Sequence, residues 1–217
     1  MNKTSIIRQT AQFVKETLHD NEAAHDWWHV YRVWNTARKI AETEEVDMFT
    51  VELGALLHDI ADFKFFDGDE TVGPQKAGKF LQSLQVDAKV ISHVENIITH
   101  ISFKGKNHRQ IFRSPELDVI QDADRLDAMG AIGIARTFNY GGYKNRAIYD
   151  PDIPPHPEMD KEAYKNSTAP TINHFYEKLL LLKERMNTET GKKMAEERHR
   201  FMEVFLERFF LEWSGKI

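Results

Sequence analysis

Four side chains of this sequence, two imidazoles and two carboxylates, are of the types that bind a divalent metal ion. His58 and Asp59 are adjacent, in the apolar run of residues 56–60. An aspartate in so apolar a segment needs a cationic partner, and no lysine or arginine lies one helical turn away. Together with His29 and Asp124, the pair offers ligands that suit Mn²⁺, Fe²⁺, Co²⁺, Ni²⁺ or Zn²⁺. For the pair taken alone, an ordinary hydrogen bond in the core is the alternative.

Helices must bring these residues together, because apolar residues recur at helical spacing along most of the chain. Asp26 is the expected cap of the helix that carries His29, and Pro115 begins the helix that carries Asp124. The expected helices cover residues 4–19, 26–43, 47–62, 74–84, 87–101 and 115 to about 127, with two more in 171–213 that separate near Asn187 or Gly191. No strand pattern is evident, so we predict an all-α protein of one domain.

Residues 139–170 form the least regular part of the sequence. They are rich in Gly, Pro, Asn and Tyr, and a connection of this length is typical of a lid or binding segment. Trp27, Trp28 and Trp34 lie in an expected helix and are interpreted as core aromatics.

The ordered pattern His29 … His58-Asp59 … Asp124 resembles the HD-domain superfamily of metal-dependent phosphohydrolases. The flanking segments 25–33 and 122–127 carry the resemblance together with the His-Asp pair. The resemblance covers about residues 20–135. It implies an HD-domain helical bundle, a single domain over 1–217 with a C-terminal extension over about 171–213, as in small bacterial members. It also implies one divalent metal ion, with Mn²⁺ as first choice and Mg²⁺ among the alternatives, and a phosphate ester or anhydride as substrate, most often a nucleotide.

Other polar residues are candidates for proton transfer and substrate binding. His25 and Asp62 are the candidates for managing the proton, although the guanosine-tetraphosphate hydrolase branch of the superfamily has an acid where Phe63 stands here. The substrate-binding candidates are His100, Lys104, Asp127, Lys144 and Lys178. Each lysine has the alternative of a solvated surface position, and Asp127 has the alternative of an ion pair with Arg125 or Arg136.

His93 and His100 could hold a second metal ion, as histidines between the His-Asp pair and the last aspartate do in binuclear relatives. They are two helical turns apart, about 10 Å. We therefore expect one metal ion per chain.

The expected reaction follows from the cations outside the motif region. Residues 139–146 supply tyrosines, a lysine and an arginine, and the C-terminal part supplies His174, Lys178 and Lys183. Such a set could bind a polyphosphate. We predict metal-assisted hydrolysis of nucleoside or deoxynucleoside triphosphates to monophosphate and pyrophosphate. The alternatives are a 5′-nucleotidase, a cyclic-nucleotide phosphodiesterase, and a metal-dependent nucleotide sensor without turnover.

The composition of the chain argues against several classes of partner and site. The 217 residues carry a formal charge of −5, which argues against nucleic acid as a partner, and they include no cysteine, which excludes disulfides and thiolate metal sites. No apolar run is long enough to span a membrane, and the N-terminal residues lack an apolar signal core. We expect a cytoplasmic protein with a small-molecule substrate, and a homodimer is compatible with the sequence.

Overall fold

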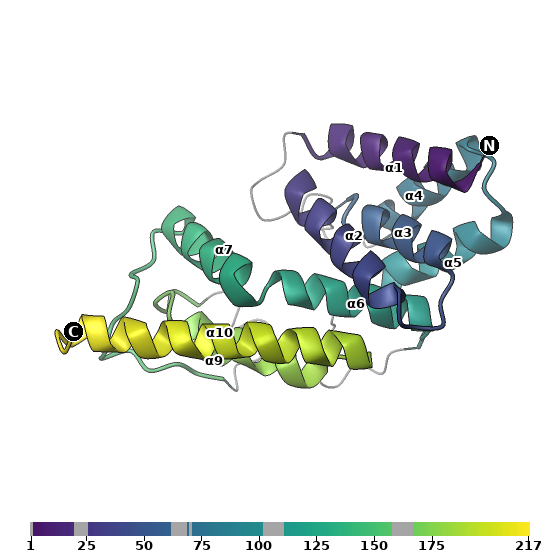
Figure 1. The fold of residues 1–217 in the computed structure, drawn as a ribbon. Coiled ribbons are helices and arrows are strands. Elements are labelled where there is room, and N and C mark those ends of the chain that lie inside the picture. Colours follow the sequence, from purple (N-terminus) through teal and green to yellow (C-terminus); the bar gives the residue numbers. More distant parts are fainter. Residues whose placement is uncertain (1, 20–25, 62–68, 70, 102–110, 158–166) are drawn as a thin grey trace. The chain divides into compact units, whose positions relative to one another are not determined.

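The computed structural model describes residues 2–19, 26–61, 69, 71–101, 111–157 and 167–217. All regular structure in these ranges is helical, with no strand among them, so the all-α prediction is confirmed (Figure 1). The elements are α1 (Lys3–Thr17), α2 (Trp27–Ala41), α3 (Met48–Leu57), α4 (Val72–Ser83), α5 (Ala88–His100), α6 (Pro115–Asp127), α7 (Gly130–Tyr143), α9 (Asn173–Glu177), the 3-10 helix η2 (Leu179–Arg185) and α10 (Glu189–Trp213).

The chain divides into two compact units, Met1–Asp124 and Arg125–Ile217, and the boundary falls inside α6. In the first unit, α3 packs against α1, α2 and α5, and α4 packs against α5. All of α3 except Met48 and Glu52 is buried, which explains why its sequence is apolar all round. The expectation of a single domain remains a prediction.

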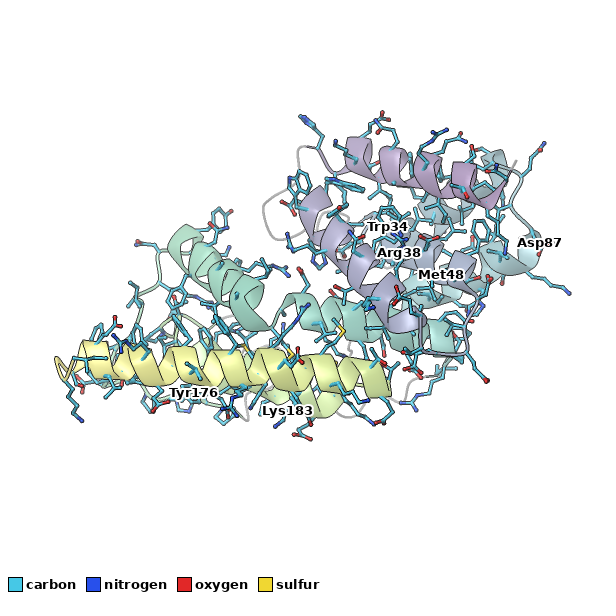
Figure 2. The ribbon with its side chains drawn as sticks, in the orientation of Figure 1. Trp34, Arg38, Met48, Asp87, Tyr176 and Lys183 are labelled. Carbon is cyan, nitrogen blue, oxygen red and sulfur yellow. The ribbon has the colours of Figure 1, made fainter. Side chains whose placement is uncertain are left out.

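Helices α2 and α3 are joined by a polar contact as well as by packing. Trp34 and Arg38 lie beside each other on α2 (Figure 2), with the guanidinium 5.7 Å from the indole ring. Both donate to one carboxylate oxygen of Glu52 on α3, each at 3.2 Å. Trp34 is half-buried against the core, whereas Trp28 is 58% exposed, so its interpretation as a core residue is wrong.

The second unit is built on α10. This helix packs against α7 and η2, and η2 packs against α9. Aromatic rings fill the contact: Phe205 of α10 lies 5.9 Å from Phe138 of α7 and 5.8 Å from Phe175 of α9, between ring centroids. Further along α10, Tyr149 packs edge-on against Trp213 at 5.1 Å.

The helices differ from expectation at several places. The first of the two helices expected in 171–213 is instead the short α9 followed by the 3-10 helix η2. The helix expected over 47–62 ends at Leu57, so His58 is its C-cap and the His-Asp pair lies in the following turn, where the backbone N–H of Ile60 bonds to the carbonyl of Leu57. Helix α7 was not predicted, and it takes in residues 139–143 of the expected lid. The caps at Asp26 and Asp87 and the helix start at Pro115 are confirmed.

Candidate functional site

His58 is held in one orientation by the end of α3. Its Nδ1 lies 2.8 Å from the carbonyl oxygen of Ala55. Since a carbonyl only accepts hydrogen bonds, Nδ1 must carry the proton and donate it. The lone pair is therefore on Nε2, and the side chain, 7% exposed, presents that nitrogen as a metal ligand would.

His29 meets His58 from the first turn of α2. The carboxylate of Asp26 accepts the backbone N–H of His29 at 2.9 Å, so the cap of α2 fixes the backbone that carries the ring. Nε2 of His29 lies 3.3 Å from Nε2 of His58, and His29 is only 3% exposed. Both buried imidazoles thus direct their Nε2 atoms toward one point.

Two carboxylates complete the group. Asp59 Oδ2 lies 3.8 Å and Asp124 Oδ1 lies 3.5 Å from Nε2 of His29. The side chain of Asp59 is 21% exposed and that of Asp124 is 42% exposed, against 4% for His29. The group is therefore closed on the imidazole side and open to solvent on the carboxylate side.

The two imidazole nitrogens, 3.3 Å apart, have the separation of neighbouring ligands on a divalent cation, and the two carboxylate oxygens lie slightly farther from Nε2 of His29, at 3.5 and 3.8 Å. Ligand bonds of about 2.1 Å place neighbouring ligand atoms about 3.0–3.4 Å apart in octahedral or tetrahedral geometry. Ligand atoms of His29, His58 and Asp59 lie within 4.8 Å of one another, and Asp124 approaches the same imidazole nitrogen. The charges of two carboxylates would offset those of the ion. The four residues that we predicted as ligands are thus brought together, and their metal-binding role remains a prediction.

The two predicted proton-transfer residues, His25 and Asp62, lie outside the described residues, as does the substrate candidate Lys104. Their roles stay as predictions from the sequence.

His93 and His100 have other partners in the first unit. Nε2 of His93 lies 2.9 Å from the hydroxyl of Ser114 and 3.5 Å from the carboxylate of the buried Glu116. Nδ1 of His100 donates to the carbonyl of Asn96 at 2.8 Å, and its ring packs on Phe112. The contacts of His93 were not apparent from the sequence, because Ser114 and Glu116 are 21 and 23 positions away in the chain.

Asp127 is only 4% exposed and forms a close ion pair with Arg136. The guanidinium of Arg198 also contributes a favourable charge interaction with Asp127, and it donates to the backbone carbonyl of Leu126. The ion pair that the sequence offered as the alternative for Asp127 is thus present, and its role in binding substrate stays a prediction.

The remaining substrate candidates, Lys144 and Lys178, belong to the second unit. Lys144 lies 5.7 Å from the ring of Tyr140 and 4.9 Å from that of Tyr143, both exposed rings. Cation–π contacts of this kind hold an exposed ammonium in place. The sequence had indicated the segment but not the stacking, which depends on α7 bringing residues 140 and 143 onto adjacent positions.

His174 has a strongly perturbed imidazole. Burial, together with the nearby charges of Lys178 and Arg146, lowers the pKa of its imidazole from 6.5 to about 3. The ring is therefore neutral at physiological pH. Arg146 also donates to the carbonyl of Ser167 at 2.5 Å and lies over the ring of Tyr140. Positive charge thus gathers here from Lys144 and Lys178, the residues that follow α7 and α9, and from Arg146 between them.

Comparison with known proteins identifies related chains. A family model described as the HD domain matches residues 27–129. Protein YpgQ of Bacillus subtilis is 36% identical over 218 residues, which span 99% of this chain and 97% of YpgQ. The crystal structure of an HD-superfamily hydrolase from Bacillus thuringiensis superposes with a TM-score of 0.80 at 43% identity, covering 98% of this chain and 99% of that one. B. subtilis YpgQ in complex with ADP superposes with a TM-score of 0.76 at 33% identity, over 96% and 95% of the two chains.

Among the described residues, none of the helices combines the length and the apolar character needed to cross a bilayer.

Proposed function

This chain belongs to the HD-domain family, as its motifs predicted, and from that premise we propose that it hydrolyses nucleoside or deoxynucleoside triphosphates to monophosphate and pyrophosphate. The HD-superfamily fold supports a metal-dependent phosphohydrolase. The observation that carries the proposal is the convergence of His29, His58, Asp59 and Asp124, with the imidazoles buried and the carboxylate side open. A site open on one side is what separates a catalytic metal centre from a structural one.

Each residue of the group has a definite task in this proposal. His29 and His58 would hold the ion through their Nε2 atoms, and the backbone bond to Ala55 keeps the His58 tautomer correct for it. Asp59 and Asp124 would bind it with negative charge. When bound, a divalent ion supplies Lewis acidity toward a phosphoryl oxygen and lowers the pKa of water. His25 or Asp62 would take the proton.

A nucleotide substrate has support from a relative. The YpgQ structure with ADP shows that a protein 33% identical to this one binds a nucleoside diphosphate. Lys144 and Lys178 are our candidates, from the sequence, for the cations that bind a polyphosphate. A triphosphate has three or four negative charges to neutralise, whereas a monophosphate needs fewer cations. Pyrophosphate is also a better leaving group than a sugar alkoxide.

The decisive experiment is product analysis. Metal-free protein is loaded with Mn²⁺ and incubated separately with nucleoside triphosphates, nucleoside monophosphates and cyclic nucleotides, and products are resolved by anion exchange. We expect monophosphate and pyrophosphate from the nucleoside triphosphates, and no product from the monophosphates or the cyclic nucleotides. Nucleoside and orthophosphate from monophosphates would show a 5′-nucleotidase instead, and nucleotide binding without any product would show a sensor.

Substitutions separate the metal site from the polyphosphate cations. Asp59→Asn should abolish turnover and metal uptake together. Lys178→Ala should leave metal content intact and raise KM for triphosphate about tenfold, the effect of losing one charged hydrogen bond. Lys192→Ala is the matched control, since that ammonium is engaged by Glu189 at 2.6 Å and should leave KM unchanged. An unchanged KM in Lys178→Ala would remove Lys178 from the site.

A further inference from the structure

Helix α10, the long yellow helix of Figure 1, has a second apolar face that its own unit does not cover. Its inner face buries Ala195, Met202 and Leu206. On the opposite side, Phe201 and Val204 are 53% and 54% exposed. We define the outer face of α10 as the six residues Met194, Glu197, Phe201, Val204, Arg208 and Leu211, with Met194 and Leu211 half-buried and the other four exposed.

The spacing of the outer face is that of a coiled-coil seam. Its positions are separated by 3, 4, 3, 4 and 3 residues. A 3-4 repeat keeps one stripe of a helix turned toward a partner helix over its whole length, and it is the pattern of a and d positions in a heptad. Four of the six residues are apolar, and the two charged ones have opposite sign. A stripe with this spacing and composition is typical of a surface that packs against another helix.

The outer face is complementary to itself when a second copy runs antiparallel. We place the twofold axis between Met202 and Glu203. Two residues then meet across the axis when their numbers add up to 405, and each a position meets a d position, as in antiparallel coiled coils. Phe201 then meets Val204 of the partner subunit. Met194 meets Leu211 of the partner subunit, and Glu197 meets Arg208 of the partner subunit. Every apolar residue of the stripe faces an apolar residue, and each acid faces a base.

Charges beside the stripe agree with the same register. Arg200 and Glu207 lie on the same flank of the stripe, and Arg200 lies within two residues of the position that faces Glu207 of the partner subunit. Arg208 bonds Glu212 of its own helix at 2.8 Å through Nε. The two terminal nitrogens of a guanidinium supply four more N–H donors, so Arg208 can also bind Glu197 across the axis.

We propose that the outer face of α10 pairs antiparallel with the same face of a second copy of this chain, which makes the protein a homodimer. In this register residues 192–213 of the two α10 helices overlap, which gives a contact about 33 Å long. One helix pair of this length lies near the lower limit of area for a stable interface. The dimer is therefore concentration-dependent, and it forms independently of the metal site.

Light scattering after size exclusion tests the pairing. At about 100 µM chain, a concentration suited to a small interface, the wild-type protein should have twice the 25.3 kDa mass of the chain. Glu197→Arg and Arg208→Glu each place two like-charge pairs at the axis and should raise the dissociation constant about tenfold or more. The double variant Glu197→Arg/Arg208→Glu restores opposite charges and should restore the dimer. Glu196→Arg, an exposed reversal beside the stripe, is the matched control and should remain dimeric.

Disulfide trapping tests the direction and register. Because the chain has no cysteine, introduced cysteines give clean cross-links. Protein carrying Met194→Cys should cross-link on oxidation only when mixed with protein carrying Leu211→Cys, since 194 and 211 meet across the axis and the two copies of either site are about 25 Å apart. A wild-type monomer, single reversals that stay dimeric, or cross-linking of either variant alone would each overturn the proposal.

Discussion

The metal site predicts that His58 and His93, two histidines of the same unit, respond differently to substitution. His58→Ala removes one Nε2 from a group that joins α2, the turn after α3, and α6. His93→Ala is the matched control: it removes a half-buried ring that bonds Ser114 at 2.9 Å. Both changes delete an imidazole. Only the first should change the response of the protein to a divalent ion.

The size of the effect follows from linkage. A ligand present at about 100 times its dissociation constant stabilises the folded state by about 2.7 kcal/mol. For a unit of this length, about 1 kcal/mol corresponds to a shift in Tm of about 4 °C, so saturating Mn²⁺ should raise Tm by about 10 °C. In His58→Ala the rise should vanish. In His93→Ala the starting Tm should be lower by the loss of about 1 kcal/mol of hydrogen bonding, with the metal-dependent rise intact.

Thermal unfolding with and without Mn²⁺, after dialysis against a chelator, measures both quantities, and elemental analysis counts the bound ion. We expect about one ion per chain in the wild type and in His93→Ala. A full metal-dependent rise in His58→Ala would refute the assignment of the ligands. A loss of that rise in His93→Ala would mean that the ion is bound elsewhere in the unit.

Three further predictions concern stability. Asp26→Ala should cost about 1 kcal/mol through loss of the α2 cap and should weaken Mn²⁺ binding through His29, whereas unchanged metal affinity would contradict the coupling. Gly133→Ala places a Cβ 2.3 Å from a backbone carbonyl oxygen and should cost about 1–3 kcal/mol in denaturant unfolding, while Gly142→Ala, with no atom within 4 Å, should gain about 0.5–1 kcal/mol. The pKa of His174 is about 3 in the folded protein and 6.5 when unfolded, so the unfolded state takes up the proton first as the pH falls. The free energy of unfolding at about pH 5 should therefore be about 2 kcal/mol lower than at about pH 7.5. Urea titrations at both pH values measure this loss, and His174→Gln should remove the part that is due to His174.

The periodic spacing of apolar residues was sufficient to predict most helices of the first unit. The apolar residues of α2 and α5 and the caps at Asp26 and Asp87 are local signals, and local signals determine where such helices begin. The grouping of His29, His58, Asp59 and Asp124 was predictable because their order resembles the HD-domain motif, and because His29 and Asp124 lie beside the apolar side of their helices. The exposure of the two carboxylates was not, since it depends on which neighbouring elements cover them.

Helix α7 shows why the rest was not predictable. Its four glycines each disfavour a helix by about 1 kcal/mol, so the sequence reads as a loop. The structure requires small residues there: a Cβ on Gly141 would lie 2.2 Å from the hydroxyl of Thr171, and Gly130 has φ +67°. Contacts distant in the chain thus override local propensity. The available signal was the series of small residues at helical spacing, 130, 133, 137 and 141.

The position of the His-Asp pair directly after α3 has a consequence for the order in which ligands bind. The last carbonyl groups of a helix carry the negative end of its dipole, about half an elementary charge, and Ala55 provides one of them to His58. With the carboxylates of Asp59 and Asp124 added, the potential at this point is strongly negative before any ion arrives. A phosphate anion is repelled there, and a cation is attracted. We therefore expect compulsory ordered binding, metal first and nucleotide second, with nucleotide affinity that depends steeply on metal concentration.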